Sequence, residues 1–321
     1  MKTIGLIGGM SWESTAIYYR LLNELCRDIL GGLHSAPLLL YSFDFEEIET
    51  LQRHDDWAGA AQKLARAGQA LAVIKAALTA EPDAADLHND LGRACNNLGE
   101  LRAAATAFNK AVELDPGLVD AHANLGHVLH ALGRRSEALA AYQSALSLDA
   151  EHQRALSGLG VLHLGEGDPA TAVDFFRRAT TIRPGDARLW GQLGVAQQRA
   201  GDGEAAEAAY RKALELDEDD AELRLNHGIT LQELDRLAEA IREYHAAARI
   251  APGSPAIQNH LGNALLAADD ADGALDTTDC CLSLDPGNTA ALSARAVALN
   301  RLGRTHEARE LVDTDLRVRQ V

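Results

Sequence analysis

Residues 86–117 read DLHNDLGRACNNLGELRAAATAFNKAVELDPG, and the pattern of this stretch recurs along most of the chain every 34 residues. The repeated positions include a glycine ladder, formed by Gly92, Gly126, Gly160, Gly194, Gly228 and Gly262. An alanine series from Ala104 to Ala308 keeps the same phase, and an aromatic side chain follows four residues after each of its first five members. Separate features that share one phase over more than 200 residues indicate one structural unit stacked seven times.

Each unit is expected to be a pair of helices. In the first full unit we expect helix A over residues 86–98 and helix B over residues 101–114. Gly99 suits the left-handed conformation that the turn between them requires, and Pro116 ends the unit because proline cannot continue a helix. The ladder glycines should let helix A approach helix B closely, and the aromatic residues should fill the space between successive units.

Six positions of this unit have a spacing that resembles the tetratricopeptide repeat, a helix–turn–helix unit; they are Gly92, Gly99, Ala104, Phe108, Ala111 and Pro116. The resemblance implies a mainly α fold, an α-α superhelix (a TPR solenoid), over about residues 70–321. The pattern weakens in the last two repeats, as terminal repeats often do where they face solvent. Asp269 and Thr278 replace the turn glycine and the aromatic residue in repeat six, and Ala296 replaces the ladder glycine in repeat seven.

Charge and composition exclude several classes of partner. The formal net charge of −17 argues against nucleic acid and against anionic membrane surfaces, because both require a cationic face. No run reaches the ~20 apolar residues of a membrane helix. The four cysteines show no spacing typical of a metal site or of a disulfide framework, which favours a reducing cytoplasm. We therefore expect a cytoplasmic protein without cofactor or metal.

The N-terminal residues have a different pattern. A short apolar strand over residues 3–7 precedes a helix that ends near Leu30, and a second strand over residues 36–43 precedes a helix from about Trp57. This order predicts a small α/β (βαβα) fragment over residues 1–72. The loop formed by Gly8, Gly9, Met10 and Ser11 follows the first strand, where backbone N–H groups would meet a carboxylate or a phosphate.

The segment KTIGLIGGMSWEST at residues 2–15, with Tyr18-Tyr19 and GLHSA at residues 32–36, resembles the start of the aspartate/glutamate racemase family. The resemblance implies a cofactor-independent enzyme in which two cysteines exchange a proton with the amino-acid α-carbon. Neither cysteine motif of that family is present, and Cys26 matches neither position. Because the reaction needs a base on one face and an acid on the other, we expect no enzyme activity. The fragment is then a docked capping element, a weakly folded remnant or a fusion scar.

The join between the two parts is expected to be helical. Counting back 34 residues from Ala104, Ala111 and Pro116 gives Ala70, Ala77 and Pro82. Residues 73–84 are therefore interpreted as a junction helix and half repeat, followed by seven repeats over residues 85–321. No Gly/Ser-rich linker separates the parts, so a rigid join is favoured over a flexible tether.

The stacked helix A faces are expected to line a concave groove. Polar residues placed there by helical spacing are Asn89, Arg93, Asn124, His127, His130, Gln192, Gln198, Asn226, Gln232, Asn259, Asn263 and Asn300. Amide side chains offer both a donor and an acceptor to the backbone of an extended peptide. His127 and His130 are one turn apart, but no third metal ligand accompanies them.

The hypothesis is a non-catalytic scaffold that binds a protein or peptide partner in this groove. One alternative is a racemase-related protein that lacks its catalytic cysteines. The other is a truncated or fused product. Residues 284–313 resemble repeats of bacterial proteins that continue into a 2-oxoglutarate/iron oxygenase domain.

Overall fold

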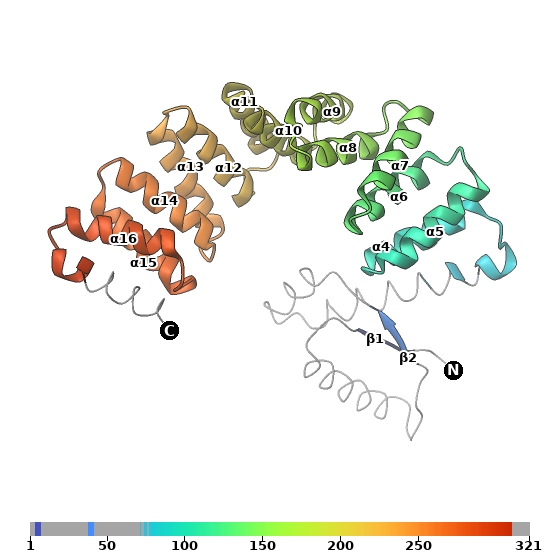
Figure 1. Cartoon of the computed structure of the whole chain (residues 1–321), viewed down its shortest axis with the longest axis horizontal. Coiled ribbons are helices and arrows are strands. Elements are labelled where there is room, and N and C mark those ends of the chain that lie inside the picture. The colour runs from blue at the N-terminus through green and yellow to red at the C-terminus, as the bar shows by residue number, and fades with distance from the viewer. Residues whose placement is uncertain (1–3, 8–37, 42–70, 72–73, 76, 310–321) are drawn as a thin grey trace, which may run out of the picture. The chain divides into compact units, whose positions relative to one another are not determined.

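The computed structural model describes residues 4–7, 38–41, 71, 74–75 and 77–309 (Figure 1). The chain divides into two compact units, residues 1–162 and residues 163–321, and each is described separately below. Among the described helices, none has both the length and the apolar character needed to cross a membrane.

The first unit contains a pair of short strands. Strand β1 (Ile4–Ile7) lies parallel to β2 (Leu38–Tyr41), with Ile4 opposite Leu38 and Ile7 opposite Tyr41. The rest of the expected α/β fragment lies outside the described residues, including the Gly8–Ser11 loop and Cys26. Two paired strands alone do not establish a racemase-like domain, so that part of the expectation stays a prediction.

The helices of the first unit follow the expected repeat. They are α4 (Ala85–Asn97), α5 (Leu101–Leu114), α6 (Val119–Ala131) and α7 (Arg135–Leu148), and α8 (Gln153–Gly165) contains the boundary between the units. The bounds of α4 and α5 agree with the predicted helices A and B to within one residue. Leu71 is buried and residues 77–80 are helical, directly before the turn at Pro82.

The second unit continues the alternation of helix A and helix B. Its helices are α9 (Pro169–Ile182), α10 (Ala187–Arg199), α11 (Gly203–Leu216), α12 (Ala221–Glu233), α13 (Leu237–Ile250), α14 (Pro255–Ala267), α15 (Ala271–Leu284) and α16 (Thr289–Arg301). Residues 305–309 begin the helix B of repeat seven. The even-numbered helices are helices A, and the odd-numbered helices are helices B.

The ladder glycines lie directly against the aromatic ring of their own repeat. A Cβ atom at Gly92 would lie 2.6 Å from Cδ1 of Phe108, and one at Gly228 would lie 2.5 Å from Cε1 of Tyr244. The aromatic rings therefore pack against helix A of their own repeat. At least two of them also reach the next repeat, as expected: the Tyr142 ring approaches Gly158, and the Tyr244 ring lies 5.8 Å from that of His260.

The turn between helix A and helix B needs a left-handed residue. Gly99 has φ +73°, and the same position is taken with similar φ by Gly133, Gly167, Gly201 and Gly303. Asp235 and Asp269 adopt φ values of +59° and +64° in repeats five and six. The backbone requirement is thus the same in every repeat, and aspartate meets it where glycine is absent.

A second repeated hydrogen bond closes the turn before five of the helices A, α4, α6, α10, α12 and α14. A side-chain N–H near the start of helix A donates to the backbone carbonyl six residues earlier, at 2.9 Å from Trp190 to Pro184 and at 3.0 Å from His122 to Pro116. His88, Arg224 and Gln258 make the equivalent bond. Four side-chain types therefore satisfy a carbonyl that the proline position leaves without a helical partner.

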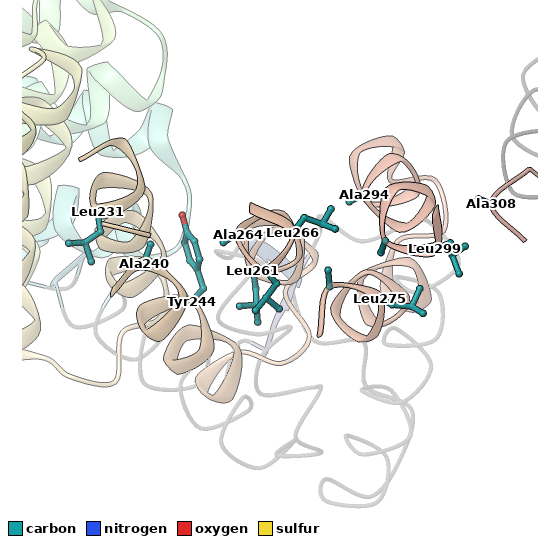
Figure 2. Packing of buried hydrophobic residues seen from close by; sticks show 13 residues of the cluster. Leu231, Ala240, Tyr244, Leu261, Ala264, Leu266, Leu275, Ala294, Leu299 and Ala308 are labelled. Atoms are coloured by element: carbon teal, nitrogen blue, oxygen red, sulfur yellow. The ribbon is translucent and has the colours of Figure 1, made fainter. Parts of the chain in front are cut away.

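The core of repeats five to seven is built from alanine, leucine and a single tyrosine (Figure 2). Tyr244 and Ala240 from α13 pack with Leu231 of α12 and Leu261 of α14, and all four are almost fully buried. Small residues at the helix contacts keep the layers thin, so each helix A is covered by the helices B on either side of it.

Candidate functional site

The helix A surface of the second unit carries a repeated pair of side chains. In each of repeats four to seven, helix A has an apolar residue and an amide residue that are three positions apart. The pairs are Val195 with Gln198, Ile229 with Gln232, Leu266 with Asn263, and Val297 with Asn300. Residues three apart share one face of a helix, so each pair forms a small surface with both characters. We call these eight residues the helix A face.

This face is uncharged, and all of its members except Leu266 are at least partly exposed. Gln232, Asn263 and Asn300 are exposed, and Val297 keeps 43% of its surface in contact with solvent. Val195, Gln198 and Ile229 are half-buried, whereas Leu266 is buried. An exposed apolar residue beside an exposed amide suits a ligand that contributes both side-chain and backbone contacts.

Buried tyrosines of helix B orient two of the amides. The Tyr244 hydroxyl donates to Gln232 Oε1 at 3.1 Å, and the Tyr210 hydroxyl donates to Gln198 Oε1 at 3.4 Å. Burial raises the pKa of Tyr244, and the negative charge of Glu233 raises it further, so the phenol keeps its proton. Since Oε1 of Gln232 is engaged, its Nε2 amide hydrogens are the groups that a ligand would meet.

Three further residues of the second unit that were predicted to line the groove are less exposed than Gln232, Asn263 and Asn300. Gln192 and Asn259 are half-buried, and their side-chain oxygens are buried without a hydrogen-bond partner in the described part of the chain. Asn226 is half-buried, and its backbone carbonyl accepts a bond from Thr230. Gln198 also donates to Glu233 at 2.9 Å, which ties α10 to α12.

In the first unit the predicted amides bind each other. Asn124 Nδ2 donates to Asn89 Oδ1 at 3.0 Å, both side chains are buried, and Arg154 donates to the oxygen of Asn124. These bonds connect α4, α6 and α8. Asn89 and Asn124 therefore hold neighbouring repeats together, which is a different role from the predicted contact with a ligand.

The remaining predicted residues of the first unit are at the surface. Arg93 is exposed and forms an ion pair with Asp90 at 3.2 Å. His127 is exposed and His130 is half-buried on α6. Within the described ranges, no group of three His, Cys, Asp or Glu side chains is arranged to hold a metal ion.

The apolar members of the helix A face escaped the sequence analysis. Val195, Ile229, Leu266 and Val297 are apolar, so a pattern of polar residues does not include them. The signal was available, since each lies three positions from a predicted amide in the 34-residue phase. Aligning the repeats and comparing both positions together would have revealed the pairs.

Comparison with known families agrees with this geometry. Models described as tetratricopeptide repeat match residues 124–187 and 225–279, residues 163–226, and residues 289–314. A further model described as TPR repeat matches residues 92–133. Together these matches extend over residues 92–279 and 289–314, which include every member of the helix A face.

Solved structures of repeat proteins share the fold. YrrB, described as a TPR protein with an unusual peptide-binding site, is 26% identical with a TM-score of 0.53, covering 60% of this chain and 98% of YrrB. Cut9-Hcn1 of the APC/C is 17% identical with a TM-score of 0.60, covering 78% of this chain and 51% of that one. PilF of Pseudomonas aeruginosa is 22% identical with a TM-score of 0.59, covering 66% and 96%. The repeat phase, the helix pairs and these matches together identify the chain as a member of the tetratricopeptide repeat family.

Proposed function

We propose that this protein is a non-catalytic interaction scaffold that binds an extended peptide segment of a partner on the helix A face of its second unit. One observation carries the proposal: four successive helices A each carry one apolar and one amide residue three positions apart, and all of these side chains except Leu266 reach the surface. In tetratricopeptide arrays the helix A surfaces form the concave side, and extended concave surfaces are the binding surfaces of solenoid proteins.

The chemistry of the pairs fits an extended peptide. An amide side chain can bond to a backbone N–H or C=O group whatever the peptide's sequence, and the adjacent valine or isoleucine provides contact for an apolar side chain. Gln232 would donate to a peptide carbonyl, because its own oxygen is held by Tyr244. Asn263 and Asn300 are exposed and offer both kinds of group.

The likeness to YrrB supports the same proposal. That protein is described as having an unusual peptide-binding site, and this chain matches nearly its whole length. No charged residue belongs to the helix A face, so we expect the bound segment to be recognised by shape and backbone bonding. Binding should then depend only weakly on salt concentration, since salt screens interactions between charges.

The test uses a phage-displayed library of random peptides, selected on the full chain. Selected peptides are synthesised and their affinity is measured by isothermal titration calorimetry against wild type, Asn263→Arg and the matched control His127→Arg. Asn263 and His127 occupy the same exposed position of repeats six and two. We expect Asn263→Arg to weaken binding at least tenfold, about 1.4 kcal/mol, while His127→Arg leaves it unchanged. Equal affinity for all three proteins would contradict the proposal.

A further inference from the structure

Three ionisable residues of the second unit occupy positions where other repeats have mostly apolar side chains. Glu207 stands where repeats one to three, five and six have Ala105, Leu139, Val173, Ile241 and Leu275, and where repeat seven has Arg309. His227 stands where repeats one to four and six have Leu91, Leu125, Leu159, Leu193 and Leu261, and where repeat seven has Arg295. Glu243 stands where three of them have Ala107, Ala141 and Ala209. The three exceptions fall in adjacent helices, α11, α12 and α13.

These side chains meet in space. Glu207 Oε1 lies 3.8 Å from Nε2 of His227, and Glu243 Oε1 lies 3.8 Å from Nδ1 of the same ring. The His227 side chain is 9% exposed, and those of Glu207 and Glu243 are 7% and 22% exposed. The histidine of repeat five thus lies between a carboxylate of repeat four and a carboxylate of its own repeat. We call this group the Glu–His–Glu cluster.

Arginines balance both carboxylates. Glu207 is 3.2 Å from Arg211 and 3.5 Å from Arg236, and Glu243 is 2.9 Å from Arg224. The cluster lines a cavity of about 410 Å³ whose other residues come mostly from α11, α12 and α13. Further charged side chains around this cavity are Glu215, Glu218, Glu239 and Arg242. Every helix that contributes to the cavity therefore places charge near His227.

The arrangement matches a protonated ring. An imidazolium carries an N–H on both nitrogens, whereas a neutral imidazole leaves one nitrogen as an acceptor. With a carboxylate on each side, a neutral ring would direct a lone pair at one of them. Neither ring nitrogen of His227 has a hydrogen-bond partner in the described part of the chain. The neighbouring His227 also lowers the pKa of the Glu243 carboxyl, and Arg224 adds to that effect.

We propose that His227 holds a proton between Glu207 and Glu243, and that the protonated ring stabilises the contact between repeat four and repeat five. We call this contact the pH-sensitive joint. The protonated ring joins α11 to α13 through α12 by two ion pairs. Loss of the proton removes both pairs and leaves a buried neutral ring between two carboxylates. Helix α11 then separates more easily from α12 and α13.

The sign of the pH dependence follows from the proton that the folded state holds. The joint is firm while His227 carries its proton, and it weakens when rising pH removes that proton. The carboxylates must be ionised, so the joint also weakens when Glu243 takes up a proton below its ordinary range. The repeat contact is firmest between these two limits.

The test compares the full chain with a variant in which the cluster receives side chains used at the same positions of other repeats, Glu207→Val, His227→Leu and Glu243→Ala. Replacing buried ion pairs by apolar residues of suitable size often leaves a protein as stable or more so. Hydrogen exchange of α11–α13 is followed by mass spectrometry from pH 5.5 to 8.5, corrected for the intrinsic exchange rate. We expect opening of these helices in wild type to rise about tenfold over this range, which corresponds to about 1.4 kcal/mol.

The variant should show no such rise, and α4–α5 should behave alike in both proteins. Equal pH dependence of α11–α13 in both would overturn the proposal. A second measurement does not depend on the triple variant: the His227 ring resonances of wild type, assigned with His227→Gln, are followed by NMR over the same range. A ring that is already neutral at pH 5.5 would also overturn it, whereas a protonated ring that titrates in step with opening supports it.

Discussion

Replacing Gly228 by alanine is expected to destabilise the array, whereas the same change at Gly262 is not. A Cβ atom at position 228 would lie 2.5 Å from Cε1 and 2.8 Å from Cδ1 of Tyr244. That ring is fully buried, and carbon atoms are in favourable contact only at about 3.5–4.0 Å. At position 262 the nearest atoms are Thr277 Oγ1 at 3.0 Å and Thr278 Cγ2 at 3.1 Å, so small side-chain shifts make room.

The magnitudes follow from two opposing effects. Alanine inside a helix is favoured over glycine by about 1 kcal/mol. Inserting a methyl group into a close-packed contact costs roughly 1–3 kcal/mol, because the neighbours leave their preferred positions. For Gly228→Ala the packing cost should dominate, with a net loss of about 0–2 kcal/mol. For Gly262→Ala the helical preference should dominate, with a net gain of up to about 1 kcal/mol.

The assay is urea unfolding of the full chain followed by far-UV circular dichroism. Because repeat arrays can unfold in more than one step, hydrogen exchange of α12–α13 and α14–α15 is measured alongside and locates the change. The expected order of the midpoints is Gly262→Ala at or above wild type and Gly228→Ala below it. If both variants shift the midpoint by the same amount in the same direction, the close approach of Tyr244 to Gly228 does not explain the glycine ladder.

Two further outcomes follow from the geometry. Asp235→Gly and Asp269→Gly should each stabilise the protein by about 1 kcal/mol in urea unfolding, because these aspartates hold φ of +59° and +64° at a cost that glycine does not have. Gly133→Asp should lower the free energy of unfolding by a similar amount. An unchanged midpoint in all three variants would contradict this reasoning. Glu243 has its pKa lowered by His227 and Arg224, so it stabilises the folded state above its ordinary value of 4.5, and that contribution is lost as pH falls below it. The midpoint of wild type should therefore fall more steeply in acid than that of Glu243→Gln, and parallel curves would show that the pairing contributes nothing.

The sequence by itself determined the repeat. The 34-residue phase of Gly92, Ala104 and Phe108 predicted the helix pairs, and the observed bounds of α4 and α5 follow it to within one residue. This was possible because helix ends, turn glycines and small contact residues are local requirements that recur in every unit. The left-handed turn at Gly99 was predicted for the same reason, and its φ of +73° confirms it.

Only the tertiary structure decided what the polar residues meet. The positions of Asn89 and Asn124 in the repeat predicted amides that face a ligand. Stacking of α4 on α6 instead brings the two amides together, with Asn124 Nδ2 3.0 Å from Asn89 Oδ1. Glu207 and His227 each interrupt the repeat pattern, but nothing along the chain says that they meet; the packing of α12 on α11 places them side by side. Helical period fixes which face a residue occupies, whereas its partner depends on the rotation and register of the neighbouring repeat.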